Sequence, residues 1–433
     1  MTSIITSQSL RLLISLFFLI IAINYRRYFL LIIPFLQYAG FIFMVKGRPP
    51  EMNFIICYAE LLVLGIFALR RGFRIKDKTS LYLFLFPLLS LSSLLFAQGN
   101  FYQSVFIIML LSLSAFLYQF YLKNMEWLIR KNIFNLIVLI WSLFGILTKI
   151  FQGIKWGFSL ASYMPIGLYG ILSRGGGIGG SNHVGGIILF FLPFVNDYRI
   201  ITLASIFLLF TFSRGIYIVL LLFWIIKFYP FIKVKKITVK AFTLFVILIC
   251  LIWVITPQSY TTAISNWMFQ RMGLTEHWGT TLSKHLINLF YESPRWGIYK
   301  EALDIFKKTL FQGVGLGGFY WGEKFIGEES LFSNAHNLYL TLLSEGGIFF
   351  FLGFILLLGY MFHMASKYSH AALLSLIIFS IYGLFSGEIY EVSGLASACD
   401  YYYLIFLLAY LKYMKKLKSN RAFERNLIIR NNV

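Results

Sequence analysis

The stretch "LFTFSRGIYIVLLLF", residues 209–223, decides the fold class, because it interrupts an apolar run that is too long for one membrane helix. The run covers residues 200–229 and is broken near its middle by Ser213, Arg214 and Gly215. As a single helix it would measure about 45 Å, whereas the hydrocarbon core of a bilayer is roughly 30 Å thick. We therefore expect two short membrane helices, with Arg214 at their junction or lining a cavity.

The composition predicts a membrane protein throughout the chain. Hydrophobic residues make up 59% of the 433 residues, charged residues only 13%, and phenylalanine alone occurs 47 times. A single soluble core could not bury that much apolar surface. Leucine, isoleucine and phenylalanine instead recur in runs of roughly 17 to 22 residues, the length that a helix needs to cross a bilayer. The predicted fold class is an all-α polytopic membrane protein.

The positive charge is a topology signal rather than a nucleic-acid footprint. The formal net charge is +21, and the basic residues gather in the short stretches 70–76, 233–240 and 412–421. Cytoplasmic loops are enriched in lysine and arginine in this way, and such loops attract the anionic headgroups of a lipid bilayer. We expect the C-terminus in the cytoplasm and no nucleic acid as a partner. The charge distribution does not decide on which side of the membrane the N-terminus lies.

The apolar runs predict about 12 to 13 membrane helices. They cover residues 8–24, 28–45, 52–69, 80–97, 100–121, 132–150, 184–196, 200–212, 216–229, 240–256, 338–361, 371–386 and 398–412. The chain then divides into N-terminal membrane helices in 1–150, a first outer loop in 151–183, short central helices in 184–256, a large outer loop in 257–336, and C-terminal helices with a basic tail in 337–433. Loops this long usually carry function, so we look for chemistry on the outer face.

Arg214 is the first candidate for that chemistry. An arginine deep in lipid costs roughly 2.5–3.5 kcal/mol on insertion scales, so its side chain should face protein, water or an anion. An anion site fits this position, and so does an arginine that snorkels from a helix end.

Arg295 is the second candidate, in the stretch "YESPRWGIYKEALDIFKKTLFQGVGLGGF" of residues 291–319. The Ser-Pro pair at 293–294 is typical of an N-cap and a first helical residue, which places Arg295 in the first turn. A helix start offers free amide donors and a favourable dipole, and a guanidinium adds bidentate hydrogen bonds; a phosphate or diphosphate site uses these parts. The alternative is a surface ion pair with Glu292 or Glu301.

The same stretch predicts an amphipathic helix that is able to lie on the membrane surface. Its apolar residues recur at helical spacing and are Ile298, Ala302, Phe306 and Leu310. Glycines are expected to end this helix, at Gly313, Gly315, Gly317 and Gly318.

His336 is the third candidate, in "SNAHNLYLTLLSEGG" of residues 333–347, where a polar stretch meets an apolar run. Asn337 beside it can donate or accept hydrogen bonds. An interfacial histidine is the plain alternative, but two arginines on the same outer side favour a catalytic role.

For a helix that begins near His336, the helical period predicts which residues lie on the same side as the histidine. Leu340, Leu343 and Gly347 would share the face of the histidine, and Gly347 would leave room on it. Glu345 would point to the opposite side.

Weaker candidates lie in "SRGGGIGGSNHVGG", residues 173–186, an anion-tolerant loop that contains Arg174 and Asn182. No metal site is expected, because His277 and His285 lack the spacing typical of zinc ligands.

These motifs, in this order, resemble the O-antigen ligase and polymerase superfamily of bacterial inner-membrane glycosyltransferases. The matching stretches are "SRG" at 213–215, "SPRWGIYKEAL…GVGLGGF" in the large outer loop, "AHNLYLTLLSEGG" at 335–347 and the asparagine-containing helix entry "GGSNHVGGIILFFLPF" at 180–195. The likeness covers roughly residues 175–360.

The resemblance implies a GT-C-like helical enzyme at the periplasmic face of the inner membrane. Its donor would be a glycan on undecaprenyl diphosphate and its acceptor a glycan lipid. Arg214 and Arg295 match the family's two essential arginines and would hold and neutralise the diphosphate leaving group. His336 matches the essential histidine and would act as a base toward the acceptor hydroxyl, or orient it. The diphosphate or glycan site would also include Asn337, Asn182 and Arg174. Neither a cofactor nor a metal is implied.

Polymerase and ligase share this chemistry and differ in the acceptor. The spacing between Arg174 and Gly185 is similar to a polymerase motif, and a composition rich in Phe, Ile, Tyr and Lys is typical of polymerases. We therefore prefer an O-antigen polymerase, with a chain-length regulator as an expected partner, over an O-antigen ligase that uses lipid A-core. A flippase or transporter is less expected, because such proteins usually show internal repeats and charges inside several spans.

Overall fold

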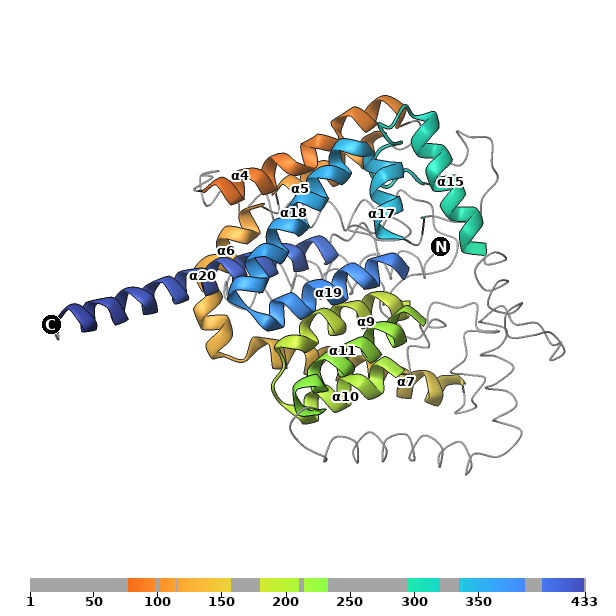
Figure 1. The fold of residues 1–433 in the computed structure, drawn as a ribbon. Coiled ribbons are helices and arrows are strands. Elements are labelled where there is room, and N and C mark those ends of the chain that lie inside the picture. Colours follow the sequence, from red (N-terminus) through yellow and green to blue (C-terminus); the bar gives the residue numbers. More distant parts are fainter. Residues whose placement is uncertain are drawn as a thin grey trace, which may run out of the picture.

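The computed structural model of the chain describes residues 77–97, 101–113, 115–156, 180–209, 214–232, 294–319, 335, 337–385 and 399–431. Within these residues every regular element is a helix (Figure 1), as the all-α prediction requires. Three helical segments there are long and apolar enough to cross a membrane, and they cover residues 78–96, 101–130 and 338–368. The described part of the chain is thus compatible with a helical membrane protein.

The helices follow the predicted spans wherever the structure describes them. In chain order they are α4 (Lys78–Leu85), η2 (Phe86–Phe96), α5 (Phe101–Leu113), α6 (Ala115–Arg130), α7 (Ile133–Trp156), α9 (Gly180–Phe191), η3 (Leu192–Phe194), α10 (Tyr198–Leu209), α11 (Arg214–Ile232), α15 (Pro294–Lys308), α17 (Leu338–Thr341), η4 (Leu342–Gly346), α18 (Gly347–Tyr368), α19 (His370–Phe385) and α20 (Cys399–Asn431). The predicted spans 8–24, 28–45, 52–69 and 240–256 lie outside the described residues.

Several predicted spans end too early, among them 132–150 and 338–361, whose helices continue to Trp156 and Tyr368. The span predicted for 100–121 continues through α6 to Arg130, and the span predicted for 398–412 continues as α20 to Asn431. Between positions 412 and 420 the side chains of α20 are half-buried or exposed, and Figure 1 shows this helix projecting past the other helices. Hydropathy located the apolar part of each helix, but helical hydrogen bonding does not stop where the apolar residues end.

The long apolar run around Arg214 forms two helices, as predicted. α10 ends at Leu209, and α11 begins at Arg214. The two helices pack side by side, and the indole N–H of Trp224 in α11 donates to the hydroxyl of Ser205 in α10 over 3.2 Å.

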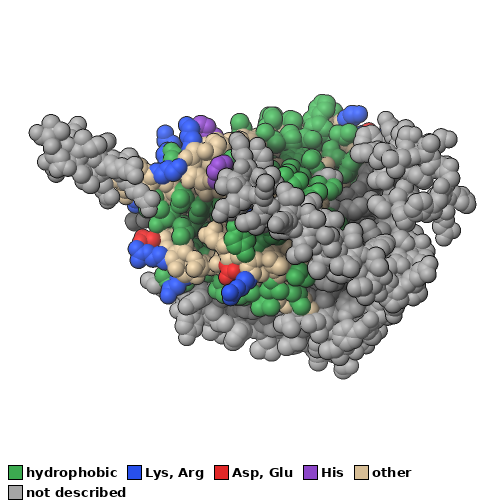
Figure 2. Space-filling model, turned by 60° about the horizontal axis from the view of Figure 1, so that its bottom comes forward, with side chains coloured by type: hydrophobic (Ala, Val, Ile, Leu, Met, Phe, Trp, Pro, Cys, Tyr) green, Lys and Arg blue, Asp and Glu red, His purple; other side chains and the backbone are tan. Residues whose placement is uncertain are grey.

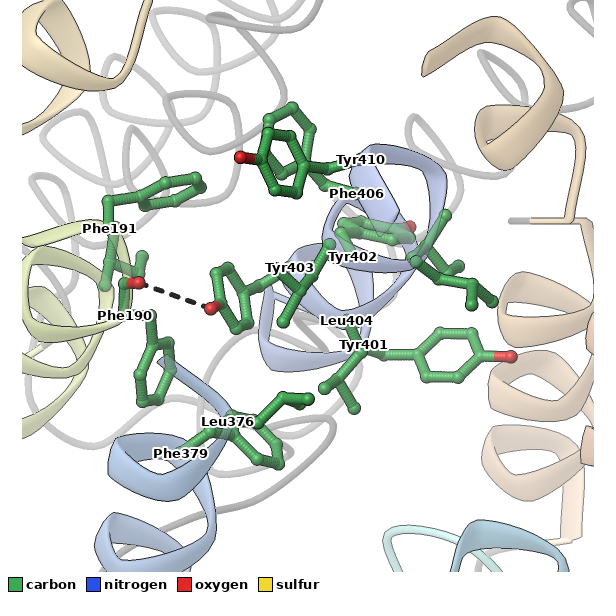
Figure 3. Packing of buried hydrophobic residues seen from close by; sticks show 14 of the residues in the cluster. Phe190, Phe191, Leu376, Phe379, Tyr401, Tyr402, Tyr403, Leu404, Phe406 and Tyr410 are labelled. Carbon is green, nitrogen blue, oxygen red and sulfur yellow. Dashed lines mark hydrogen bonds between the residues drawn. The ribbon is translucent and has the colours of Figure 1, made fainter. Parts of the chain in front are cut away.

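The core joins α9, α19 and α20 through aromatic rings (Figure 3). The ring of Phe190 in α9 lies 4.8 Å from that of Tyr403 in α20 and 5.1 Å from that of Phe379 in α19. Pro193 turns the end of α9 into the 3-10 element η3. The hydroxyls of Tyr403 and Ser375 both donate to the Phe190 carbonyl, the first over 3.2 Å. These contacts set α9 at a definite position against α19.

Basic side chains gather at one end of the described bundle, beside the C-terminal part of α20 (Figure 2). They include Lys367 at the end of α18, Lys418 in α20, and Arg130 at the end of α6, which lies near Tyr413 of α20. Lys418 Nζ donates to the Lys367 carbonyl over 2.8 Å, which ties α20 to the end of α18. In the view of Figure 2 apolar side chains cover a neighbouring band.

Much of the apolar face of α15 is covered by protein, while a position of this helix on the membrane surface stays a prediction. The helix packs against η4 and α17. Its buried residues are Ile298, Ala302 and Ile305, while Leu310 is exposed beyond the helix end. Ile305 replaces the predicted Phe306 and Leu310 on the buried face, because residues four and seven positions after Ile298 share its side of a helix.

Candidate functional site

The start of α17 is hydrogen-bonded to the end of α19. Asn337 is the N-cap of α17, and its side-chain oxygen accepts from the backbone N–H of Tyr339 and of Leu340, as an N-cap asparagine should. Its Nδ2 donates to the carbonyl of Leu384 over 3.3 Å. A Cβ on Gly383 would lie 3.0 Å from the Leu338 side chain, so these two helix ends are in close contact.

The first turns of α9 fit between the end of α19 and the start of α11. A Cβ on Gly186 would lie 3.1 Å from the ring of Tyr382 in α19. A Cβ on Gly185 would lie 2.1 Å from the Ile216 side chain in α11 and 3.5 Å from Leu208 in α10. Two adjacent glycines therefore let α9 approach its neighbours on two sides at this end of the bundle.

The start of α15 belongs to the same region through α17. A small apolar cluster contains Ile298 and Ala302 of α15, together with Ala335, which is fully buried. Leu340 of α17 packs against this cluster. The helix that begins at Pro294 is thus held against the segment that follows Ala335.

The structure brings together the helix starts that carry the predicted site residues. Arg214 is the first residue of α11, Arg295 the second of α15 and Asn182 the third of α9, while Asn337 is half-buried at the α17 cap. In Figure 1 these helix starts lie on the side away from the projecting end of α20. The placement of Arg295 in a first helical turn is confirmed.

The side-chain geometry among these residues stays a prediction. The side chains of Arg214, Arg295 and Asn182 are not described, and Arg174 and His336 lie outside the described residues. The alternative ion pair with Glu292 also lies outside them. Glu301 Oε2 is buried and has no hydrogen-bond partner in the described part of the chain.

The predicted helical face after His336 is wrong beyond Thr341. There the helix widens into the π-helical element η4, and Gly347 has a φ of 78°. A π-helical turn shifts every later side chain relative to an α-helix. A Cβ on Gly347 would lie 2.2 Å from the carbonyl oxygen of Gln312, so this glycine leaves no room for a substrate. It makes room for the chain that follows α15.

That chain is the glycine loop, residues 313–319. Reasoning from the sequence did not predict that this loop contacts η4. α15 ends at Lys308, before the glycines that were predicted to end it, and the loop that follows has positive φ at Gly313, Gly315 and Gly317. A Cβ on Gly313 would lie 2.4 Å from the Glu345 carbonyl oxygen, and one on Gly315 would lie 2.5 Å from the Ser104 hydroxyl. The signal for this contact was Glu345 itself, an acidic residue inside an apolar run.

The described residues contain no group of three or more His, Cys, Asp or Glu side chains that could hold a metal ion. The absence of a metal from the reaction stays a prediction, because His277, His285 and His336 lie outside the described ranges and the side chain of His183 is not described.

Together, these features are compatible with a helical membrane protein in which the motif-bearing helix starts lie on the side of the bundle away from the basic end. Residues 199–357 match the family model described as O-antigen ligase. This match supports the similarity of the chain to the O-antigen ligase/polymerase superfamily. It contains Arg214, Arg295, His336 and Asn337, whereas Asn182 and Arg174 precede it. No curated protein matches the chain.

Proposed function

We propose that the protein transfers a glycan from undecaprenyl diphosphate to an acceptor sugar hydroxyl at the periplasmic face of the bacterial inner membrane. The observation that carries the proposal is a chain of contacts at one end of the bundle, in which α9 packs on α11 and α19, the start of α17 on the end of α19, and α15 on α17. The match to the O-antigen ligase family covers the starts of α11, α15 and α17.

The distribution of charge supports an active site on the outer side. Lysine and arginine are retained on the cytoplasmic side of membrane proteins. The basic end of the bundle, with the ends of α6 and α18 and the α20 tail, then faces the cytoplasm. The helix starts lie at the opposite end, where a lipid-linked glycan is presented after translocation.

The helix starts suit a diphosphate. The first N–H groups of α9, α11 and α15 have no partner within their own helix and lie at the positive end of a helix dipole, whereas those of Tyr339 and Leu340 in α17 are capped by Asn337. An arginine at the first position of α11 and at the second of α15 would add charge and bidentate hydrogen bonds to phosphate oxygens. Since negative charge grows on the diphosphate as the glycosidic bond breaks, fixed guanidinium groups lower the barrier to transfer.

In this proposal His336 receives the proton of the acceptor hydroxyl, or orients that hydroxyl, as the new glycosidic bond forms. Asn337 holds the start of α17 and adds an amide beside the histidine. Asn182 and Arg174 contact the glycan or the diphosphate from the α9 side. The reaction needs no nucleotide, because the diphosphate is already a good leaving group.

We favour a polymerase that joins lipid-linked repeat units and works with a chain-length regulator. The spacing between Arg174 and Gly185 and the amino-acid composition support this choice. A ligase that transfers the glycan to lipid A-core is the second candidate, and it is supported by the description of the matching family. A flippase of the same lipid-linked glycans is a third, weaker candidate.

The lipopolysaccharide gel profile of a deletion strain tests the proposal. Core with a single repeat and no ladder identifies a polymerase, whereas complete loss of O-antigen from the core, with lipid-linked polymer accumulating, identifies a ligase. Complementation with His336→Ala, Arg214→Ala or Arg295→Ala should fail, while Arg199→Ala, an exposed arginine in α10, should restore the profile. Correct membrane insertion of each variant is checked by immunoblot. A normal ladder with His336→Ala would remove the catalytic role of this histidine.

A further inference from the structure

The glycine loop and η4 form a clamp beside the proposed site. The N–H groups of Val314 and Gly315 donate to the carbonyls of Ser344 and Glu345, each over 3.0 Å. Ile348 N–H donates to the carbonyl of Phe311, also over 3.0 Å. The chain that leaves α15 is therefore hydrogen-bonded to the place where the helix after Asn337 breaks.

The break in the helix supplies these acceptors. Carbonyls near a helix break lose their usual partners further along the helix. Here η4 is followed by Gly347, whose positive φ interrupts the regular pattern, and the loop amides take over the freed carbonyls of Ser344 and Glu345. The positive φ values and close approaches at Gly313 and Gly347 show that only glycine fits on either side of this contact.

The carboxylate of Glu345 completes the clamp. Its Oε2 accepts from Gly317 N–H over 2.7 Å, and its Oε1 accepts from Phe319 N–H over 3.2 Å. The residue is only 2% exposed. A buried carboxylate is costly unless it is hydrogen-bonded, and hydrogen bonds to a charged acceptor are stronger than neutral ones. One side chain thus orders the last part of the glycine loop.

We propose that Glu345 is a positioning residue for the transfer reaction. The loop that it holds continues directly from α15, whose first turn carries Arg295. Glu345 itself continues from α17, whose start carries His336 and Asn337. By fixing the loop, Glu345 fixes the diphosphate-binding arginine relative to the proposed base. This role rests on the proposed function, and it matters because small misplacements of catalytic groups cost large factors in rate.

Glu345→Gln is the sharpest variant, because it keeps the size of the side chain and replaces one acceptor oxygen with an NH2 group that cannot accept. Ser344→Ala is the matched control. Ser344 lies in the same π-helical turn and is buried, but its hydroxyl donates to Leu340 and Thr341 carbonyls within its own helix. Its backbone carbonyl, which holds the loop, is unchanged by the substitution.

Hydrogen exchange of the full-length protein in detergent measures the protection of the glycine loop in the absence of substrate. In Glu345→Gln, peptides that cover residues 313–319 should exchange at least about tenfold faster, as expected when a charge-assisted hydrogen bond is lost. In Ser344→Ala they should keep the wild-type rate. Unchanged exchange of this loop in Glu345→Gln would overturn the clamp.

The affinity for undecaprenyl diphosphate, measured by tryptophan fluorescence, shows how the loss of the clamp affects the proposed site. Glu345→Gln should raise the Kd roughly tenfold, because Arg295 is displaced, whereas Ser344→Ala should stay within about twofold of wild type. Faster loop exchange with an unchanged Kd would overturn the positioning role and leave the proposed function standing. Absence of binding by the wild type would overturn the proposed function and the positioning role with it, while the exchange result would still decide the clamp.

Discussion

The side-chain amide of Asn337 donates to the carbonyl of Leu384 over 3.3 Å, while its oxygen accepts from the backbone N–H groups of Tyr339 and Leu340. One residue thus caps α17 and joins the start of this helix to the end of α19. Since the cap uses the oxygen and the link to α19 uses the nitrogen, substitutions separate the two roles.

Asn337→Asp should be less harmful to stability than Asn337→Ala. Aspartate keeps the capping oxygen and loses only the donor to Leu384, whereas alanine loses the cap as well, which costs about 1 kcal/mol. Thermal unfolding of the detergent-purified protein should give melting temperatures in the order wild type, Asp, Ala. An alanine variant as stable as the aspartate variant would show that the cap contributes nothing.

Gly347→Ala should destabilise the protein by more than about 2 kcal/mol, because a left-handed backbone disfavours a side chain and the new Cβ would lie 2.2 Å from the Gln312 carbonyl. Gly359→Ala in the same helix is the control, since nothing lies within 4 Å of its Cβ position. There alanine should leave stability unchanged or raise it by up to about 1 kcal/mol. Chemical denaturation measures both, and equal effects would contradict the fit of the glycine loop on Gly347.

Gly185→Ala should weaken the packing of α9 on α11, because its Cβ would lie 2.1 Å from Cδ1 of Ile216. Ile216→Val removes that atom. The double variant should therefore recover much of the melting temperature and of the lipopolysaccharide profile that Gly185→Ala loses. If valine gave no recovery, α9 and α11 would not meet as the structure places them.

Ser375→Ala and Tyr403→Phe should interact in a double-mutant cycle. Both hydroxyls donate to the Phe190 carbonyl, so either one alone still satisfies it. Removing both leaves a buried acceptor without these donors, and the double variant should lose roughly 1–3 kcal/mol more than the sum of the single variants. Additive losses of unfolding free energy would contradict this shared acceptor.

Local signals predicted the elements well. The Ser-Pro pair before Arg295 predicted the start of α15, and the polar interruption at Arg214 predicted the two helices α10 and α11, because caps, prolines and charges act on their own turn of helix. Hydropathy predicted the spans that the structure describes. These features depend on neighbours in sequence, which one chain displays directly.

Long-range contacts could not be read in the same way. The helical period predicted an open position at Gly347, but that position is filled by the carbonyl of Gln312, thirty-five positions earlier in the chain. The same period placed Glu345 away from the histidine and gave it no partner, although it holds two amides of the glycine loop. The glycines at 185 and 186 are evident in the sequence, but the residues of α11 and α19 that they contact could not be predicted from it.

The central claim is that the starts of α11, α15 and α17 form one diphosphate-binding transfer site, and the most direct measurement is release of undecaprenyl diphosphate. The purified full-length protein is incubated with undecaprenyl-diphosphate-linked glycan from the host, and the released lipid is quantified by mass spectrometry. Wild type and Arg199→Ala should release it, whereas Arg214→Ala, Arg295→Ala and His336→Ala should each lose at least about 100-fold in rate, as enzymes do when a transition-state contact is removed. Release at the wild-type rate by both arginine variants would contradict the account.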